Sequence, residues 1–395
     1  MPRFLLILCL ALPCVSAAAA MVQTEAIYQQ HCASCHGSDR LGGMGPALLP
    51  ENLGRLHRRQ AAKVIAEGRL ATQMQGYQDK LTGAEIQALV DYIYADLPQL
   101  PEWEFAQIAA SRVEHFKTES LGSKPVHKAD PLNLFVVVET GDHHATILDG
   151  DRFVALTRFA TRYALHGGPK FSPDGRYVYF ASRDGWISKY DLYSLKTVAE
   201  VRAGINTRNA AVSGDGRFVM VANFLPHTLV VLDARNLAPL KVIKVQDKNG
   251  KSSRVSAVYD AAPRSSFVAA LKDIPEIWEI SYDEKAPPIY DGLVHDYRMG
   301  EAIATSGFLG TRRTLLDDYL DDFFFDQSYA HVIGAARDGG KGQVVNLDIR
   351  RKVAELPLPG LPHLGSGISW NRNGRAVLAT PNLKEGVVSV IELGS

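Results

Sequence analysis

The sequence has no excess charge of either sign, few cysteines and, beyond its first residues, no long apolar run. Its 395 residues carry 43 Lys and Arg against 43 Asp and Glu. A general nucleic-acid binder or a polybasic membrane-surface protein would need a basic excess, so neither class fits. Hydrophobic residues make up 46% of the chain, which is too much for a disordered protein. We therefore expect a globular protein of about two to three domains, with no membrane span after the N-terminal segment.

The N-terminal segment has the pattern of a secretory signal peptide. Arg3 provides a positive charge, Phe4 to Leu12 form a short apolar core, and Ser16 to Ala20 are small residues suited to peptidase cleavage. The pattern predicts a signal peptide over residues 1–20 and a periplasmic protein. The alternative is an uncleaved anchor, because apolar residues continue to Val22.

Only two of the four cysteines, Cys32 and Cys35, remain after the predicted cleavage, and His36 follows them directly. A zinc site would need two further ligands at suitable spacing, and the sequence has no second cysteine pair. Two thiols three residues apart can bind both vinyl groups of a heme covalently, and the adjacent His36 is then the proximal iron ligand. The motif therefore predicts one covalent heme c.

The residues around this motif predict a small helical domain over residues 21–98. The loop from Gly42 to Leu48 resembles the Gly-Pro-x-Leu loop of class I cytochromes c, whose proline carbonyl accepts a hydrogen bond from the proximal imidazole. A later helix begins after Thr82, which forms a capping box with Glu85. The second axial ligand is expected to be Met74, which precedes this helix; Met44 is the alternative. A Pro-rich linker is expected to begin at residue 99 and end near residue 130.

From residue 131 onward the pattern predicts a β-propeller. Aromatic or β-branched runs alternate with Asp-Gly-Arg and Asn-Gly-Arg turns, and the turn residues Asp174 and Asp215 are 41 positions apart. That period is typical of one four-stranded propeller blade. Residues 131–395 would hold about five to six such blades. Because a propeller has to close, we expect either a small propeller or a C-terminally truncated form of a larger one.

The order of these parts resembles the cytochrome cd1 family, from about residue 25 to the end. The most specific match is the segment Tyr163-Ala164-Leu165-His166. The resemblance implies a class I cytochrome c domain followed by a propeller, eight-bladed in the family, that binds the non-covalent heme d1. It implies that His166 is the proximal ligand of that heme. It also implies that Arg183 and Arg208 bind the carboxylates of the macrocycle.

One departure from the nitrite reductases of this family points to a different reaction. Asp321 stands where the first distal histidine is expected, while the second, His363, is kept. The loss of one proton donor should weaken nitrite reduction greatly. The pattern is similar to the branch of the family that completes heme d1 synthesis by oxidising a propionate of dihydro-heme d1 to an acrylate. His363 could then be a distal iron ligand or the base, and Asp321 or a nearby Tyr is an alternative base.

Three functions stay open on the sequence. The first is this dihydro-heme d1 dehydrogenase, an oxidoreductase. The second is a cytochrome cd1 nitrite reductase that forms NO, and the third is a non-catalytic heme d1 carrier or electron-transfer protein. The resemblance implies a monomer with a tetrapyrrole substrate and an electron-acceptor protein as partner. A cd1 nitrite reductase or another heme d1 maturation protein is a further possible partner, and no nucleic-acid partner is expected.

Overall fold

The computed structural model describes residues 14–54, 56–70, 72–97, 101–290, 304–336, 341–358, 362–363, 365, 367–382 and 384–393. The contacts divide the chain into two compact units near residue 100. Most of the predicted signal peptide lies outside the described residues. No helix among the described residues is long and apolar enough to span a membrane.

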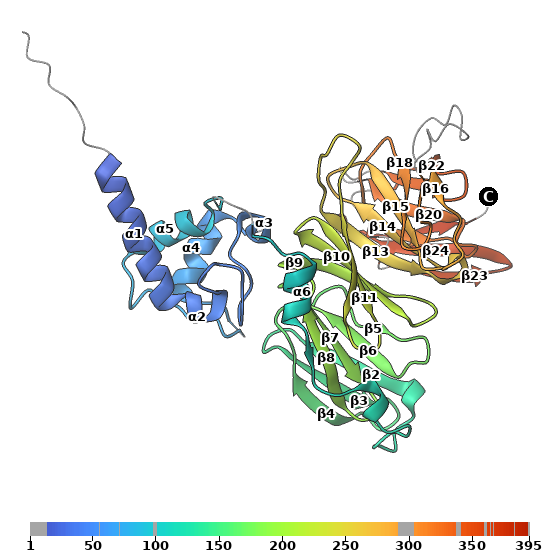
Figure 1. The fold of residues 1–395 in the computed structure, drawn as a ribbon, viewed down its shortest axis with the longest axis horizontal. Coiled ribbons are helices and arrows are strands. Elements are labelled where there is room, and N and C mark those ends of the chain that lie inside the picture. The colour runs from blue at the N-terminus through green and yellow to red at the C-terminus, as the bar shows by residue number, and fades with distance from the viewer. Residues whose placement is uncertain are drawn as a thin grey trace, which may run out of the picture. The chain divides into compact units, whose positions relative to one another are not determined.

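The first unit is helical (Figure 1). Its helices are α1 (Cys14–His31), α2 (Ala33–His36), α3 (Pro50–Leu53), α4 (Arg58–Glu67) and α5 (Gly83–Ile93). The predicted capping box is confirmed, since the Glu85 amide donates to Thr82 Oγ1 over 3.3 Å and the Thr82 amide donates to Glu85 Oε2 over 2.8 Å. The apolar face of α5 packs with Tyr28 of α1 in one buried cluster, which includes Leu89 and Val90. This unit is the small helical domain that the sequence predicts.

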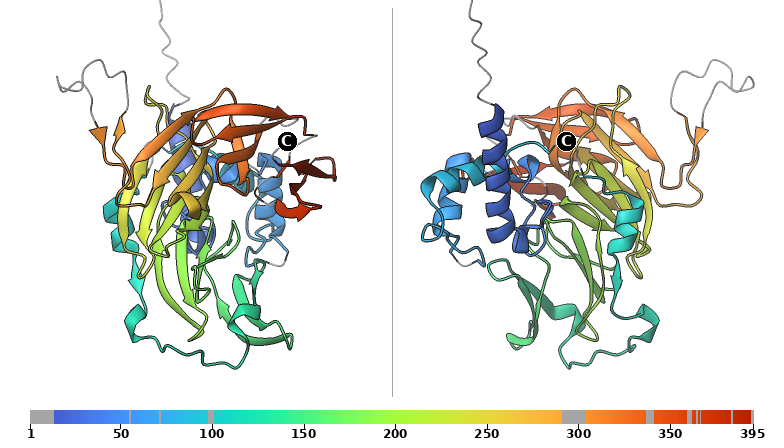
Figure 2. Two further views of the ribbon diagram at one scale, coloured as in Figure 1. Left: turned by 90° about the vertical axis from the view of Figure 1, so that its right-hand side faces the viewer. Right: turned by 60° about the vertical axis from the view of Figure 1, so that its left-hand side comes forward.

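The second unit consists of antiparallel sheets that follow one another along the chain (Figure 2). The first sheet contains β2 (Leu134–Glu139), β3 (His144–Asp149) and β4 (Val154–Ala160). The second contains β5 (Lys170–Phe171), β6 (Tyr177–Ala181), β7 (Trp186–Asp191), β8 (Lys196–Arg202) and β1 (Val113–Glu114). The third contains β9 (Asn206–Val212), β10 (Phe218–Leu225), β11 (Thr228–Asp233) and β12 (Pro239–Lys244).

The later sheets repeat this up-and-down order. The fourth sheet contains β13 (Val255–Ala261), β14 (Ser266–Leu271), β15 (Glu276–Ser281) and β18 (Thr311–Leu315). The fifth contains β19 (Leu320–Phe325), β20 (His331–Ala336), β21 (Gly342–Asn346) and β22 (Arg351–Leu356). The sixth contains β23 (Ile368–Arg372), β24 (Arg375–Pro381) and β25 (Val388–Glu392). Two short strands, β16 (Ile289–Tyr290) and β17 (Ala304–Thr305), come before β18 in the chain and form a separate two-stranded sheet. Apolar clusters fill the space between successive sheets. The predicted blade architecture is confirmed for the described residues.

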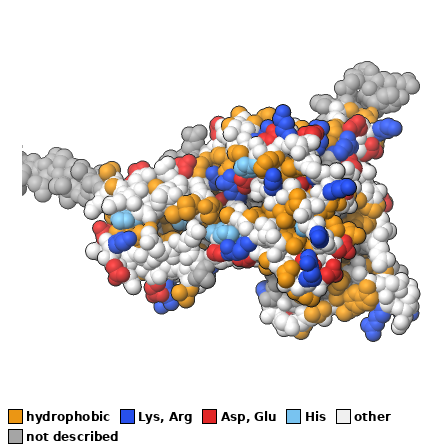
Figure 3. Space-filling model, turned by 90° about the horizontal axis from the view of Figure 1, so that it is seen from below, with side chains coloured by type: hydrophobic (Ala, Val, Ile, Leu, Met, Phe, Trp, Pro, Cys, Tyr) orange, Lys and Arg blue, Asp and Glu red, His pale blue; other side chains and the backbone are white. Residues whose placement is uncertain are grey.

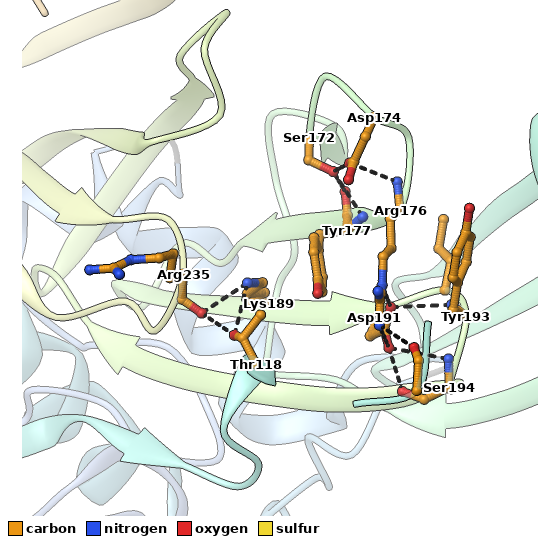
Figure 4. Close-up of polar contacts among 12 residues, drawn as sticks. Thr118, Ser172, Asp174, Arg176, Tyr177, Lys189, Asp191, Tyr193, Ser194 and Arg235 are labelled. Carbon is orange, nitrogen blue, oxygen red and sulfur yellow. Dashed lines mark hydrogen bonds and ion pairs between the residues drawn. The ribbon is translucent and has the colours of Figure 1, made fainter. Parts of the chain in front are cut away.

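In two successive blades, the turn that the sequence repeat marks joins the first strand to the second, and Figure 4 shows the turn between β5 and β6. Ser172 Oγ donates to Asp174 Oδ1 over 2.5 Å, and the same Asp174 oxygen accepts from the Arg176 amide over 3.1 Å. The next blade repeats the pattern, since Ser213 Oγ donates to Asp215 Oδ1 over 2.6 Å. The Asp side chain satisfies turn amides that would otherwise lack partners, which explains why the repeat is visible in the sequence.

The residues expected to form a linker before residue 130 are folded onto the second unit. Helix α6 (Phe105–Ser111) packs against β8 and β12, and its Ile108 is fully buried. Trp103 Nε1 donates to the Arg202 carbonyl over 2.9 Å, and β1 pairs with the edge of β8. In the 3-10 helix η1 (Thr118–Ser120), Thr118 Oγ1 donates to the Arg235 carbonyl over 2.6 Å. These contacts cover the outer edge of two blades.

An ion pair inside one blade predicts a large loss of stability on mutation. Asp191 is fully buried, and Arg176 donates to it through Nε over 2.8 Å and through Nη2 over 3.1 Å. We expect Asp191→Ala to lower the free energy of unfolding of this unit by about 3 kcal/mol, because the guanidinium loses its partner in a buried site. Urea unfolding followed by near-ultraviolet circular dichroism measures this loss. Glu284→Ala, which removes an exposed partner of Arg217, should change it by less than ~1 kcal/mol.

Candidate functional site

The Cys-x-x-Cys-His motif lies where α1 ends and the short helix α2 begins. The Cys32 amide donates to the Tyr28 carbonyl over 2.8 Å, and the His36 amide donates to the Cys32 carbonyl over 2.9 Å. This turn places both thiols on one side of a single helical turn, and both are free and partly buried. Burial, with a smaller effect of Cys35, raises the pKa of Cys32 to about 11. The motif is therefore preorganised for a group that both sulfur atoms can reach.

The His36 imidazole is held in the orientation that a proximal heme ligand needs. Its Nδ1 lies 2.8 Å from the Pro46 carbonyl oxygen, which can only accept, so Nδ1 carries the proton. The lone pair then belongs to Nε2, and burial lowers the pKa of the ring so that it stays neutral. A Cβ at Gly45 would lie 2.7 Å from His36 Cε1, so only glycine allows this approach. These contacts fit a covalent heme c at Cys32, Cys35 and His36.

The two candidate thioether ligands lie in different surroundings. Met74 packs against the buried cluster of the first unit, and so does Cys32. Its carbonyl accepts from the Arg69 amide over 2.9 Å, and its amide donates to Thr72 Oγ1 over 3.2 Å, so the loop is held in place. Met44 is 46% exposed, and the Pro46 carbonyl of the same loop contacts His36 at Nδ1. Met74 stays the predicted axial ligand.

Replacing these methionines one at a time tests the assignment. We expect Met74→Ala to abolish the weak absorption band near the red end of the oxidised spectrum that a sulfur–iron bond produces, and to lower the reduction potential of heme c. Met44→Ala should leave both unchanged. If the band disappears in Met44→Ala instead, the ligand assignment is wrong.

In the second unit, His166 lies in the loop that joins β4 to β5. Its amide donates to the Ala181 carbonyl over 2.8 Å, and Leu165 forms an isolated bridge with Ser182. Its Nδ1 lies 2.9 Å from the Arg208 carbonyl oxygen, and its Nε2 lies 2.7 Å from Arg208 Nη1. Because a guanidinium only donates, Nε2 is the acceptor and Nδ1 carries the proton. His166 therefore has the same tautomer as His36, with the lone pair on Nε2, which fits an axial iron ligand.

The predicted carboxylate-binding arginines come from segments next to His166. Arg208 is on β9, and Arg183 is in the turn between β6 and β7. The Arg183 amide donates to the Ala164 carbonyl over 3.0 Å, while its carbonyl accepts from the Thr207 amide over 3.2 Å. The backbone of Arg183 thus bridges the His166 loop and the strand that carries Arg208. The neighbouring Asp184 is buried, which raises its pKa to about 6.

A cavity of about 540 Å³ opens beside these segments. Its lining is aromatic and apolar with a few polar groups and includes Lys170, Phe171, Tyr259, Phe323, Tyr329 and Gly365. Lys170 Nζ donates to the Gly167 carbonyl over 2.8 Å, which connects the cavity wall to the residue after His166. Burial lowers the pKa of Lys170, and the Asp322 carboxylate partly offsets that effect. A cavity of this composition suits a flat, largely apolar ligand with charged substituents.

The structure separates Asp321 from His363 and brings His363 to Asp322 instead. Asp321 forms an ion pair with Lys272. Asp322 Oδ2 lies 3.4 Å from His363 Nδ1 and accepts from the Gly365 amide over 2.9 Å, while Asp322 Oδ1 accepts from Tyr259 Oη over 2.9 Å. The pairing of β19 with β20 shifts register between Leu320 and Asp322, so strand alternation alone does not tell which carboxylate meets His363. Sequence reasoning therefore missed Asp322, Tyr259 and Lys170.

Charges of both signs lie among apolar side chains on the face shown in Figure 3, in agreement with the balanced composition.

Comparison with known proteins matches both units. The family described as Cytochrome D1 heme domain matches residues 129–394, and the family described as Cytochrome C oxidase, cbb3-type, subunit III matches residues 19–93.

Several individual proteins match over nearly the whole chain. A dihydro-heme d1 dehydrogenase of Pseudomonas aeruginosa is 55% identical over 93% of this chain and 71% of its own length. A nitrite reductase of Stutzerimonas stutzeri is 27% identical over 94% of this chain and 67% of its own length. A solved structure described as dihydro-heme d1 dehydrogenase NirN in complex with DHE superposes with a TM-score of 0.84 at 54% identity, covering 94% of this chain and 75% of the other.

Proposed function

The chain belongs to the cytochrome d1 heme-domain family, and we propose that it is a dihydro-heme d1 dehydrogenase. The reaction removes two hydrogen atoms from a propionate side chain of dihydro-heme d1 and leaves the acrylate of heme d1. Two electrons and two protons leave the substrate. The 55% identity to a dehydrogenase of this specificity carries the proposal, and the arrangement at His166 and Arg208 fits it.

The second unit binds the tetrapyrrole substrate in this proposal. His166 offers Nε2 to the substrate iron, and Arg208 and Arg183 offer guanidinium groups to the substrate carboxylates, which they can bind bidentately at any physiological pH. The cavity walls, including Phe171 and Phe323, exclude water from the apolar faces of the macrocycle.

The first unit supplies the electron route. Cys32, Cys35, His36 and Met74 would hold heme c, which would supply one-electron transfer. The buried His36 ring and its bond to Pro46 keep the proximal nitrogen in one orientation, so that little rearrangement accompanies each transfer. A separate electron-acceptor protein then removes the electrons. We place the protein in the periplasm, as a monomer.

Of the residues near the substrate, His363 is the better placed base or distal ligand, because Asp321 is already paired with Lys272. The same ion pair disfavours nitrite reduction. Asp321 stands where a proton donor is expected in that enzyme, and its carboxylate is already engaged by Lys272. The nitrite reductase relative is also more distant, at 27% identity.

Incubation of the heme c-loaded protein with dihydro-heme d1 and an electron acceptor tests the proposal. We expect the absorption spectrum to change to that of the acrylate product, with two electrons delivered per molecule converted. Tight binding without conversion would support a heme d1 carrier instead. Release of NO from added nitrite would support a nitrite reductase.

A further inference from the structure

The geometry points to Asp322 as the positioning residue of this site: its carboxylate fixes the orientation and the tautomer of His363. The role of Asp322 in orienting His363 stands on geometry alone, whereas the part that His363 plays in a reaction rests on the proposed function. Asp322 Oδ2 faces His363 Nδ1 at 3.4 Å and also accepts from the Gly365 amide over 2.9 Å. Both contacts come from the loop that enters β23, whereas Asp322 belongs to β19.

The carboxylate itself is held from its other side. Tyr259 Oη donates to Asp322 Oδ1 over 2.9 Å, and the Phe323 amide donates to the same oxygen over 3.0 Å. Burial and the nearby Asp322 charge raise the pKa of Tyr259, so its hydroxyl stays a donor. Asp322 therefore cannot rotate without losing contacts made by three elements, and a fixed carboxylate is what orients a ligand or base.

The close approach of the loop requires a glycine. A Cβ at Gly365 would lie 2.3 Å from Tyr259 Oη and 2.4 Å from Asp322 Oδ2. The backbone of His363 is held separately, because its amide donates to the Pro381 carbonyl over 2.8 Å. His363 thus presents its ring to Asp322 from a backbone position that the Pro381 carbonyl holds.

The chemistry of the pair follows from these contacts. A carboxylate accepts, so the ring nitrogen that faces it carries the proton. With the proton on Nδ1, the lone pair belongs to Nε2, and that nitrogen can bind the substrate iron or remove a proton from the substrate side chain. In an imidazole without such a partner, either ring nitrogen can carry the proton. The wrong tautomer presents an N–H where a lone pair is needed. Lys170, Tyr259 and His363 are the groups that meet the Asp322 charge from the neighbouring elements.

Nitrogen NMR of the full-length, heme c-loaded protein in the ferrous state tests the inference without added tetrapyrrole. Histidine side chains are labelled with ¹⁵N, and His363→Gln identifies the His363 signals among those of the 12 histidines. We expect the wild-type ring to be protonated at Nδ1, and Asp322→Asn to move the proton to Nε2. Gly365→Ala should act in the same direction. Asp326→Asn is the matched control, because Asp326 faces His331 Nδ1 at 3.1 Å and should change only the His331 signals.

Several results would overturn the inference. They are a wild-type His363 protonated at Nε2, an Asp322→Asn ring unchanged from wild type, or an equal change at His363 in Asp326→Asn. A second measurement uses dihydro-heme d1 itself. We expect Asp322→Asn to bind it within about threefold of wild type but to convert it about 10–100-fold more slowly, with partial rescue in Asp322→Glu. If wild type binds dihydro-heme d1 without converting it, the proposed function fails, whereas the tautomer result still decides the role of Asp322.

Discussion

We expect His166→Ala to abolish binding of heme d1 while heme c remains attached and spectroscopically normal. Loss of a partner that only orients a metal ligand costs about 10–100-fold in affinity, so loss of the ligand itself should exceed that range. The substitution removes the Nε2 lone pair, and Arg208 Nη1 loses its acceptor at the same time. Titration of the heme c-loaded protein with heme d1, followed by absorption, measures the change.

A rescue experiment separates ligation from folding in this variant. His166→Gly leaves space for exogenous imidazole, which should restore the axial bond and the spectrum of the bound pigment if the binding unit is intact. Arg183→Lys serves as a milder comparison, because it keeps the charge but loses bidentate binding. Unchanged affinity for heme d1 in His166→Ala would refute the assignment of His166 as the ligand.

The second large effect is expected from removal of both thiols. In Cys32→Ser combined with Cys35→Ser, no thioether can form, so denaturing electrophoresis should show no heme attached to the chain. The second unit has its own buried clusters, and we expect it to bind dihydro-heme d1 with unchanged affinity. Conversion should fall by at least ~100-fold, because the two electrons have lost their first acceptor.

The single variant Cys35→Ser is the control for this experiment. It keeps Cys32 and His36, so one thioether bond is still possible and the heme should stay attached. Full conversion by the double variant would show that electrons leave the substrate without heme c. In that case the dehydrogenase proposal could stand, but the route through the first unit could not.

Local features of the site could be predicted from the sequence, whereas contacts between strands could not. Cys32, Cys35 and His36 are close in sequence, so helical spacing alone brings them together, and the turn around Asp174 is equally local. The pairing of His166 with Arg208 joins residues 42 positions apart, and only the family resemblance brought both into one site.

The choice between Asp321 and Asp322 shows the limit more sharply. The two carboxylates are adjacent, and a regular strand would place them on opposite faces. Which of them meets His363 depends on the irregularity between Leu320 and Asp322 in the pairing of β19 with β20. The apparent linker is a similar case. Ile108 and Trp103 gave no strong pattern of their own, and their packing depends on a blade edge far along the chain, since Trp103 and its partner Arg202 are 99 positions apart.

The contact between Arg208 and His166 has a consequence for the order of events when pigment arrives. The nitrogen that is to bind iron already accepts a hydrogen bond from a permanent cation. An incoming macrocycle must dislodge that cation, and a negatively charged substituent at its rim gives the cation somewhere to go. Iron binding by His166 and carboxylate binding by Arg208 then occur as one exchange of partners. A porphyrin without acidic substituents would have to break the hydrogen bond between Arg208 and His166 without offering Arg208 a new partner.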